Sequence, residues 1–196
     1  MRSDFMNKER TAAFTDAVLA IIMTILVLDL KKPATVSWAG LYALHNNFFA
    51  YALSFAWLGL MWYSQHNAWQ QIHKINNETI VASLVMLFFA SFSPYTTSIM
   101  EDHFFNVTAQ VLYGVVVLLV SLSNIWISHS LDVANHVSKR HLMYQAPDWV
   151  TYLDLVIKLV GMFLTVTVYP PAMSYAVLID ILLLCSMDYI GHHVKA

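Results

Sequence analysis

Long apolar stretches alternate with short polar ones along this 196-residue sequence. A helix needs roughly 20 largely apolar residues to cross a bilayer. Six stretches qualify: about Ala12 to Leu30, Leu44 to Ser64, Thr79 to Ile99 with Pro94 near its end, Val107 to His129, Trp149 to Val168, and from the Pro170-Pro171 turn to Ile190. Strands of a membrane barrel would instead alternate over ~10-residue segments. The pattern predicts an all-α membrane protein with six transmembrane helices, in a single domain spanning residues 1–196.

The distribution of Lys and Arg predicts the orientation of these helices. With the N-terminus inside, the inner side holds Arg2, Lys8, Arg10, Lys74, Lys139, Arg140 and Lys195. The outer side holds only Lys31 and Lys32, and Lys158 lies within a helix. Because cytoplasmic loops carry the excess of cations, we expect both termini in the cytoplasm and a multi-pass protein in the cell membrane.

Composition narrows the function classes. Hydrophobic residues make up 59% of the chain and charged residues 11%, against about 25% charged residues in soluble domains. The net charge of −2 provides no basic surface for nucleic acid, so membrane lipid is the expected surroundings. Cys185 is the single cysteine, which leaves no disulfide framework or thiolate metal site. No catalytic constellation can be placed, and the nine histidines are not spaced as metal ligands. We therefore expect neither an enzyme nor a cofactor.

The inner end of the first helix carries a group of polar residues. Arg10 and Phe14 are four residues apart and share a helix face, and Thr15 and Asp16 follow in the same turn. One interpretation is an N-terminal carboxylate that interacts favourably with the helix dipole, beside an interfacial arginine. The other is a fixed polar network that anchors this helix to its neighbours.

Further along the same helix, Ile21, Thr24, Ile25 and Leu28 form a stripe with the spacing i, i+3, i+4 and i+7. Such a stripe is commonly a packing surface, and a mid-helix threonine can simply bond its own backbone. Alternatively, the stripe lines a pore, where bulky aliphatic side chains form a constriction that gates by dewetting. The residues alone leave both interpretations open.

The motif R-x-x-x-F-[ST]-D, followed by A-I and T-x-L-V-L, resembles the transmembrane-protein-175 potassium channel family. The chain has Arg10, Phe14, Thr15 and Asp16, then Ala20-Ile21 and Thr24 to Leu28. The second stretch is similar as well, with Ser54-Phe55, Gly59, Trp62 and His66, although Gln65-His66 stands where the family often has two histidines. Ser93-Pro94-Tyr95-Thr96 resembles a further segment of that family. The resemblance covers the first three helices.

The resemblance implies a homotetramer in which the first helix of each subunit surrounds a central potassium pore. It places Ile21 at the narrowest constriction, and Thr24 and Leu28 in the next layers with Ile25 beside them. A potassium ion would pass transiently near Thr24, as the permeant species. Arg10, Asp16, Trp62 and His66, with the motif residues Phe14 and Thr15, correspond to an inner-end network. The five scattered glycines cannot build a carbonyl filter of the T-V-G-Y-G type.

Three ionisable residues lie within the last two predicted helices. Asp154 and Lys158 are four residues apart, and Asp180 is expected at a similar depth across the Pro170-Pro171 turn. Ionisable groups are costly in a bilayer and are usually paired or functional. We expect Lys158 to pair with Asp154 or Asp180 as a clamp between the two helices. The alternative is a charge relay in a secondary transporter, although transporters more often have helices broken near the midplane. An integral membrane enzyme is a weaker third possibility.

Overall fold

The computed structural model describes residues 2–72, 74–135 and 148–193. This part of the chain forms α-helices and no strand. The helices are α1 (Arg2–Leu28), α2 (Trp38–Ala43), α3 (His45–Gln71), α4 (Asn77–Ala90), α5 (Ser93–Asp102), α6 (Val107–Asn135), α7 (Asp148–Thr167) and α8 (Ala172–His193). A helix lies over each of the six predicted stretches, with α4 and α5 sharing the third.

Four segments of the described chain are long and apolar enough to cross a membrane: Lys8–Leu28, Asn77–Asp102, Val107–Asn135 and Trp149–Thr167. Helix α3 is as long as α1, but polar residues occupy both of its ends. The apolar part of α8 with described side chains, Ala172–Ser186, is shorter than the others. An all-helical membrane fold follows, whereas the number of crossings remains a prediction.

Capping residues set several of the helix boundaries. The side chain of Ser37 accepts a 3.1 Å hydrogen bond from the backbone N–H of Gly40 at the start of α2. Asn76 accepts one of 2.8 Å from Thr79 at the start of α4. Such side-chain oxygens satisfy backbone donors that have no partner within the helix. These two helices therefore begin where the sequence provides a cap.

The third predicted stretch is broken rather than continuous. Helix α4 ends at Ala90, and α5 restarts at Ser93 with Pro94 in its first turn. Proline has no N–H, and its ring would clash with the carbonyl of Ala90 four residues earlier. The expectation that Pro94 lies near the end of one continuous helix is thus wrong: Pro94 opens the second of two segments, well inside the Asn77–Asp102 span.

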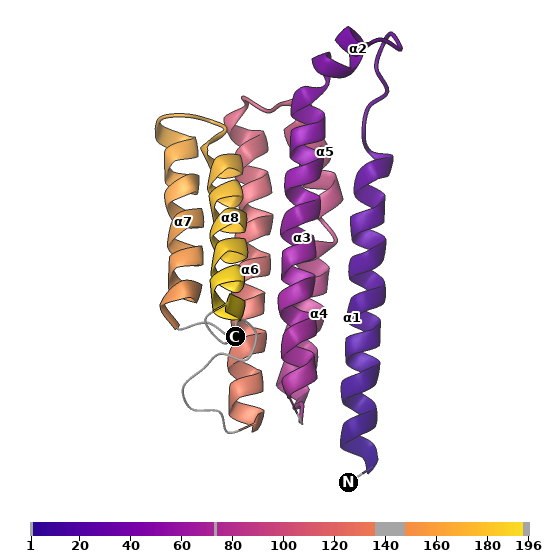
Figure 1. Cartoon of the computed structure of the whole chain (residues 1–196), viewed down its shortest axis with the longest axis vertical. Helices are drawn as coiled ribbons and strands as arrows, with labels where there is room; N and C mark the ends of the chain where they lie inside the picture. The colour runs from indigo at the N-terminus through magenta and orange to yellow at the C-terminus, as the bar shows by residue number, and fades with distance from the viewer. Residues whose placement is uncertain (1, 73, 136–147, 194–196) are drawn as a thin grey trace.

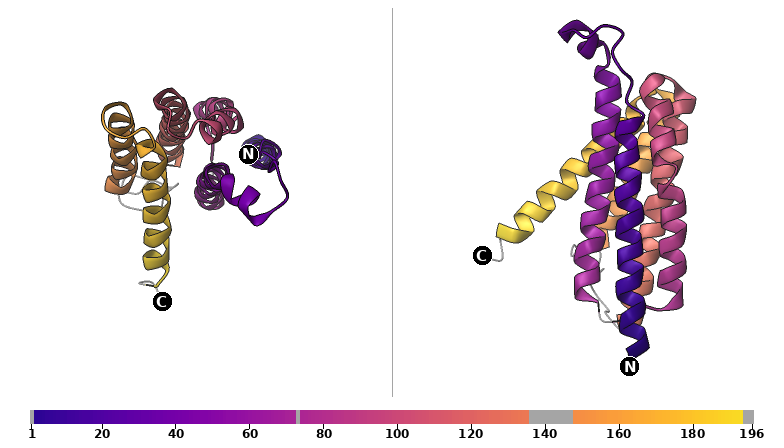
Figure 2. Two further views of the ribbon diagram at one scale, coloured as in Figure 1. Left: turned by 90° about the horizontal axis from the view of Figure 1, so that it is seen from above. Right: turned by 90° about the vertical axis from the view of Figure 1, so that its right-hand side faces the viewer.

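The helices stand side by side, with α1 at one edge of the molecule and the α7–α8 hairpin at the other (Figures 1 and 2). Helices α3, α4, α5 and α6 lie between them and contribute most of the apolar core. Helix α8 leans away from the other helices toward its C-terminal end (Figure 2). The arrangement leaves α1 with neighbours on one side only.

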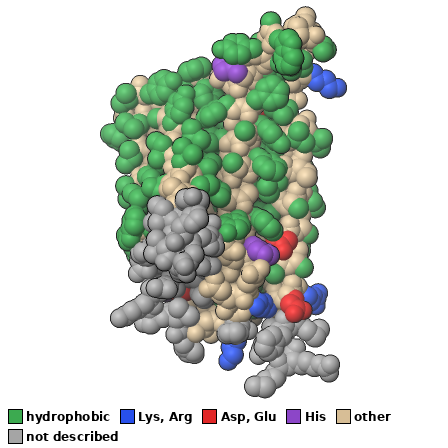
Figure 3. Space-filling view, in the orientation of Figure 1, with side chains coloured by type: hydrophobic (Ala, Val, Ile, Leu, Met, Phe, Trp, Pro, Cys, Tyr) green, Lys and Arg blue, Asp and Glu red, His purple; other side chains and the backbone are tan. Residues whose placement is uncertain are grey.

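The face of the molecule shown in Figure 3 is predominantly apolar, and the charged side chains visible there gather toward its ends. The chain runs upward in α1 and downward in α8 (Figure 1). The N-terminal end of α1 and the C-terminal end of α8 therefore point toward the same end of the bundle. A broad apolar belt flanked by charges matches the layering of a bilayer.

Candidate functional site

Helix α1 has two different faces. Thr15, Leu19, Ile22 and Leu26 are buried against the other helices. The opposite face is open and includes Ile21, which is 58% exposed, and Leu28, which is 78% exposed. Only 22% of the apolar window of α1 is buried, against 56% for α6. A single copy of the chain therefore leaves most of α1, its most apolar candidate membrane span, without a protein neighbour.

The predicted stripe lies on the open face of α1. Ile21, Thr24, Ile25 and Leu28 are all exposed, as is Phe14 nearer the inner end. The hydroxyl of Thr24 donates a 2.8 Å hydrogen bond to the carbonyl of Ile21 in the preceding turn. This bond satisfies the only hydroxyl in the stripe within its own helix, and the oxygen keeps lone pairs that can face an aqueous space.

At the inner end, a hydrogen bond joins α1 to α3. The indole Nε1 of Trp62 donates to Oδ1 of Asp16 over 2.8 Å. The ring of Trp62 also stacks on His66, with ring centroids 5.2 Å apart. His66 Nε2 lies 2.8 Å from the side-chain nitrogen of Gln70, one turn further along α3. The structure thus brings Asp16, Trp62 and His66 into one chain of contacts.

Two residues predicted to share this network lie differently. Arg10 is exposed, and no carboxylate of the described residues pairs with it. Thr15 is buried, and its Oγ1 has no hydrogen-bond partner among the described residues. Phe14 is half exposed. Of the predicted network, Asp16 and Trp62 make the hydrogen bond that joins α1 to α3.

A second connection between α1 and α3 was missed by sequence reasoning. The ammonium of Lys8 donates a 2.5 Å hydrogen bond to the backbone carbonyl of Ile72, just beyond the C-terminus of α3. A cation near the C-terminal end of a helix also interacts favourably with the helix dipole. From the sequence, Lys8 counted only as one of the positive charges on the inner side. Its bond could not be predicted, because the backbone acceptor lies 64 residues away in the sequence.

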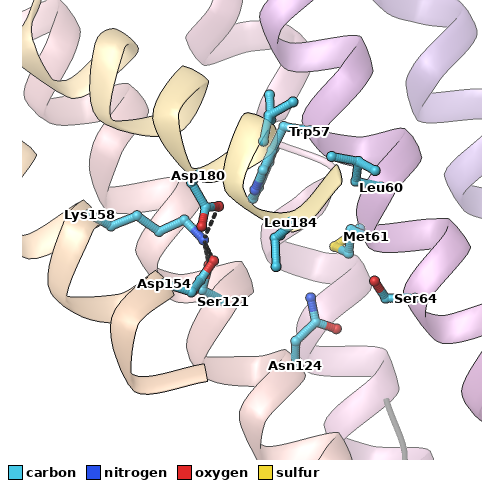
Figure 4. A pocket seen from close by; sticks show the side chains of 11 residues that line it. Trp57, Leu60, Met61, Ser64, Ser121, Asn124, Asp154, Lys158, Asp180 and Leu184 are labelled. Atoms are coloured by element: carbon cyan, nitrogen blue, oxygen red, sulfur yellow. Dashed lines mark hydrogen bonds and ion pairs between the residues drawn. The ribbon is translucent and has the colours of Figure 1, made fainter. Parts of the chain in front are cut away.

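The predicted ion pair occupies the opposite edge of the molecule. Lys158 contacts Asp154 on its own helix and lies 3.0 Å from Oδ2 of Asp180 on α8. The ammonium also donates a 3.0 Å hydrogen bond to Oγ of Ser121 on α6. All four side chains are buried. Lys158 is therefore held between both carboxylates rather than paired with one of them (Figure 4).

The described residues contain no group of three or more His, Cys, Asp and Glu side chains arranged to hold a metal ion. His136 and His141 lie outside the described residues. His129, the last residue of the fourth predicted stretch, lies within α6, which continues to Asn135.

Comparison with known proteins shows which family the chain resembles. The family model described as "Endosomal/lysosomal potassium channel TMEM175" matches residues 10–94, which cover all of α3 and the part of α1 that follows residue 9. A protein of Chryseobacterium sp. (strain P1-3) named as a potassium channel is 36% identical over 118 residues. Over residues 10–94 the chain is similar to the TMEM175 family. The match to the Chryseobacterium protein covers 60% of this chain and 62% of that protein. The chain therefore matches less than two thirds of the length of this relative.

Two further likenesses extend the comparison. The mouse protein named as the endosomal/lysosomal proton channel TMEM175 is 31% identical over 101 residues, which is 45% of this chain and 20% of the mouse protein. The crystal structure of a lysosomal potassium-selective channel TMEM175 homolog from Chamaesiphon minutus superposes with a TM-score of 0.64 and 20% identity. The superposition covers 91% of this chain and 97% of the Chamaesiphon minutus chain. The similarity to TMEM175 proteins, the shared fold and the apolar helices together make this a multi-pass membrane protein.

Proposed function

We propose that this chain is one subunit of a homotetrameric, potassium-permeable ion channel in the cell membrane. The subunit would be one six-helix domain, with α1, α3, α4–α5, α6, α7 and α8 as its crossings and both termini in the cytoplasm. The names of the bacterial relatives as potassium channels support the permeant ion. The name of the mouse relative as a proton channel makes the ion selectivity part of the test.

The observation that carries this proposal is the open face of α1. One face of this helix packs on the other helices, while Ile21, Thr24 and Leu28 face away from them. A single subunit therefore places its candidate pore residues outside its own bundle. Several copies arranged about an axis would bring these stripes together, and four copies are what the family resemblance implies.

In such an assembly, Ile21 would form the narrowest ring, with Thr24, Ile25 and Leu28 toward the outer mouth. A ring of bare aliphatic side chains repels water and ions until it widens. Opening then requires α1 to rotate or splay relative to the other helices. The Asp16–Trp62 hydrogen bond at its inner end would control that movement, within the network that the family resemblance implies for Arg10, Phe14, Thr15 and His66. The permeating ion would meet the hydroxyl of Thr24 after the constriction.

Two observations favour a second candidate, a secondary transporter. The α4–α5 span is interrupted between Ala90 and Ser93, and broken helices are typical of transporter binding sites. Asp154, Lys158 and Asp180 are buried together and could form a charge relay. This cluster lies at the far edge of the molecule from α1, however, and packs within a single subunit. The channel explains the exposed apolar face of α1, which the transporter does not, and we therefore favour the channel.

Planar-bilayer recording of the purified protein tests the two candidates. We expect unitary currents with a reversal potential that follows the potassium gradient. Ile21→Asn should raise the conductance, because a polar ring wets more readily. Ile179→Asn is the matched control, since Ile179 on α8 is 55% exposed but lies away from α1. Coupled uptake without unitary currents would favour the transporter, and equal effects of the two substitutions would refute the pore position of Ile21.

A further inference from the structure

A small cleft lies between the α7–α8 hairpin and the helices α3 and α6 (Figure 4). Its volume is about 20 Å³, which is room for about one water molecule. Its polar lining consists of Ser64 from α3, Ser121 and Asn124 from α6, Asp154 and Lys158 from α7, and Asp180 from α8. The remaining lining is apolar and comes from Trp57, Leu60, Met61, Ile181 and Leu184. The cleft thus presents two carboxyl groups and one ammonium, and its other lining residues do not titrate.

The charges in this cluster do not balance. Two carboxylates and one ammonium leave a net charge of −1, and Asp180 is 0% exposed while Asp154 and Lys158 are 3% and 2% exposed. An uncompensated charge buried away from water is costly, and in practice such a group neutralises. The cluster therefore needs one further positive charge.

The geometry indicates where this charge belongs. Lys158 donates hydrogen bonds to Asp154 and to Ser121. Asp180 lies within ion-pair distance of Lys158, yet neither of its carboxyl oxygens has a hydrogen-bond partner among the described residues. Asp154 contacts the same ammonium as Asp180, so the two carboxyl groups meet at one cation. Ionised carboxylates only accept hydrogen bonds, so two of them attract each other only when one carries a proton.

We propose that the Asp154–Lys158–Asp180 cluster is a proton-binding site, in which the Asp180 carboxylate takes up one proton and donates it in a hydrogen bond to Asp154. The proton comes from water and makes the cluster neutral, with ionised Asp154, charged Lys158 and a neutral carboxylic acid at position 180. A metal cation is a poorer occupant, because the Lys158 ammonium already lies 3.0 Å from Asp180 and the cleft holds about one water. This site is separate from the proposed pore and does not depend on it.

The bound proton ties the hairpin to the rest of the subunit. Loss of this proton would leave a negative charge at the interface where α8 packs on α3 and α6. Helix α8 already leans away from the other helices toward its C-terminal end (Figure 2). The folded protein holds one more proton here than the unfolded chain at neutral pH, so raising the pH favours unfolding. The unfolding equilibrium should shift by up to about tenfold per pH unit while the site titrates.

Infrared spectroscopy of the protein in lipid vesicles tests the site, because a protonated carboxylic acid has a carbonyl band of its own. We expect wild type to show one such band from the cluster at neutral pH. Asp180→Asn and Asp154→Asn should each lose it, since either change leaves a balanced pair with Lys158. Lys158→Met should instead gain a second band, because both carboxyl groups must then be neutral. Glu101→Gln removes the other carboxyl group that is buried among the described residues and should keep the band of the cluster.

The Asp154→Asn variant keeps a neutral Lys158–Asp180 pair, so it should fold as well as wild type by circular dichroism and size-exclusion chromatography. Its melting temperature should also lose the decline with rising pH that we expect for wild type. A wild-type spectrum without a band that depends on both Asp154 and Asp180 would overturn the proposal. A band that Asp180→Asn removes but Asp154→Asn keeps would equally overturn it, because charge balance would then not be the cause.

Discussion

The indole nitrogen of Trp62 and the carboxylate of Asp16 are joined by a 2.8 Å hydrogen bond across 46 residues of sequence. It connects α3 to the inner end of α1, the helix whose other face is open. A hydrogen bond to a charged acceptor contributes about 1.5–3 kcal/mol, and less where water reaches both groups. In the proposed channel, a bond of this strength would bias α1 toward one position and could still break during gating.

Trp62→Phe should therefore change channel gating more than stability. Phenylalanine keeps an aromatic ring against His66 but removes the N–H that binds Asp16. We expect an altered open probability in bilayer recordings, with the conductance of the open channel unchanged because the pore stripe is untouched.

Trp126→Phe provides a matched control, because Trp126 Nε1 donates a bond of the same 2.8 Å length to Glu78, between α6 and α4. This control should cost similar stability without altering gating. If the two variants gate alike, the Asp16–Trp62 bond has no special role in the movement of α1.

Gly161 determines how closely α7 and α8 approach. A Cβ atom at this position would overlap the Cβ of Ala176 and lie 3.5 Å from the backbone oxygen of Ala172. Neither neighbour is a flexible chain end, so Gly161→Ala must push the hairpin apart. Overpacking of this kind typically costs about 1–3 kcal/mol. The melting temperature in detergent should fall accordingly.

Gly59 on α3 gives the opposite expectation for the same substitution. An added Cβ would meet only the end of the flexible Met23 side chain, at 3.5 Å. Alanine in a helix interior is favoured over glycine by up to about 1 kcal/mol, so Gly59→Ala should leave the melting temperature unchanged or raise it. A similar loss in both variants would show that the hairpin packing is not specific to Gly161.

Much of the fold could be predicted from the sequence because apolar length is a strong local signal. A helix lies over each of the six predicted stretches, and the start of α6 at Val107 was predicted correctly. The break at Ala90 was not, since a proline shows that a helix is disturbed but not whether it ends or bends. The extension of α3 to Gln71 was also missed, because its last turns are polar and continue beyond the apolar stretch.

The candidate site divides in the same way. The i, i+3, i+4 and i+7 spacing grouped Ile21, Thr24, Ile25 and Leu28 correctly on one face of α1. Whether that face meets protein, lipid or water is not encoded in periodicity. The spacing also suggested that Lys158 has two possible partners, while only three dimensions place it between both. Ser121 could not be found, because a serine on a distant helix gives no sign of its partner.

Thr24 provides a direct test of the pore stripe. Thr24→Val keeps the shape of the side chain but removes its hydroxyl, while Thr24→Ser keeps the hydroxyl. The side chain is exposed and its bond is made within α1, so neither change should alter stability by more than about 0.5 kcal/mol. We expect single-channel conductance to fall in Thr24→Val and to be largely retained in Thr24→Ser. Equal conductance in wild type and Thr24→Val would remove Thr24 from the ion path.

Charge exchange across α7 and α8 tests the clamp between these helices. Lys158→Asp alone would bury three carboxyl groups with no ammonium among them, and breaking a buried pair by removing one partner costs about 3–5 kcal/mol. Adding Asp180→Lys restores the original set of charges with Asp154 still present. The double variant should therefore recover much of the yield and melting temperature that Lys158→Asp loses.

The surface pair of Lys31 and Asp102 is the control for this exchange. These side chains are 2.6 Å apart but 55% and 29% exposed, so their pairing contributes about 0–1 kcal/mol. Lys31→Asp should barely change the melting temperature, and adding Asp102→Lys should have little to restore. A double exchange in the buried cluster that stays as unstable as Lys158→Asp would contradict the clamp, because charge pairing would then not be what holds α7 to α8. If the double exchange restores the melting temperature in the buried cluster but not in the surface pair, burial away from water is the reason that these charges must be paired.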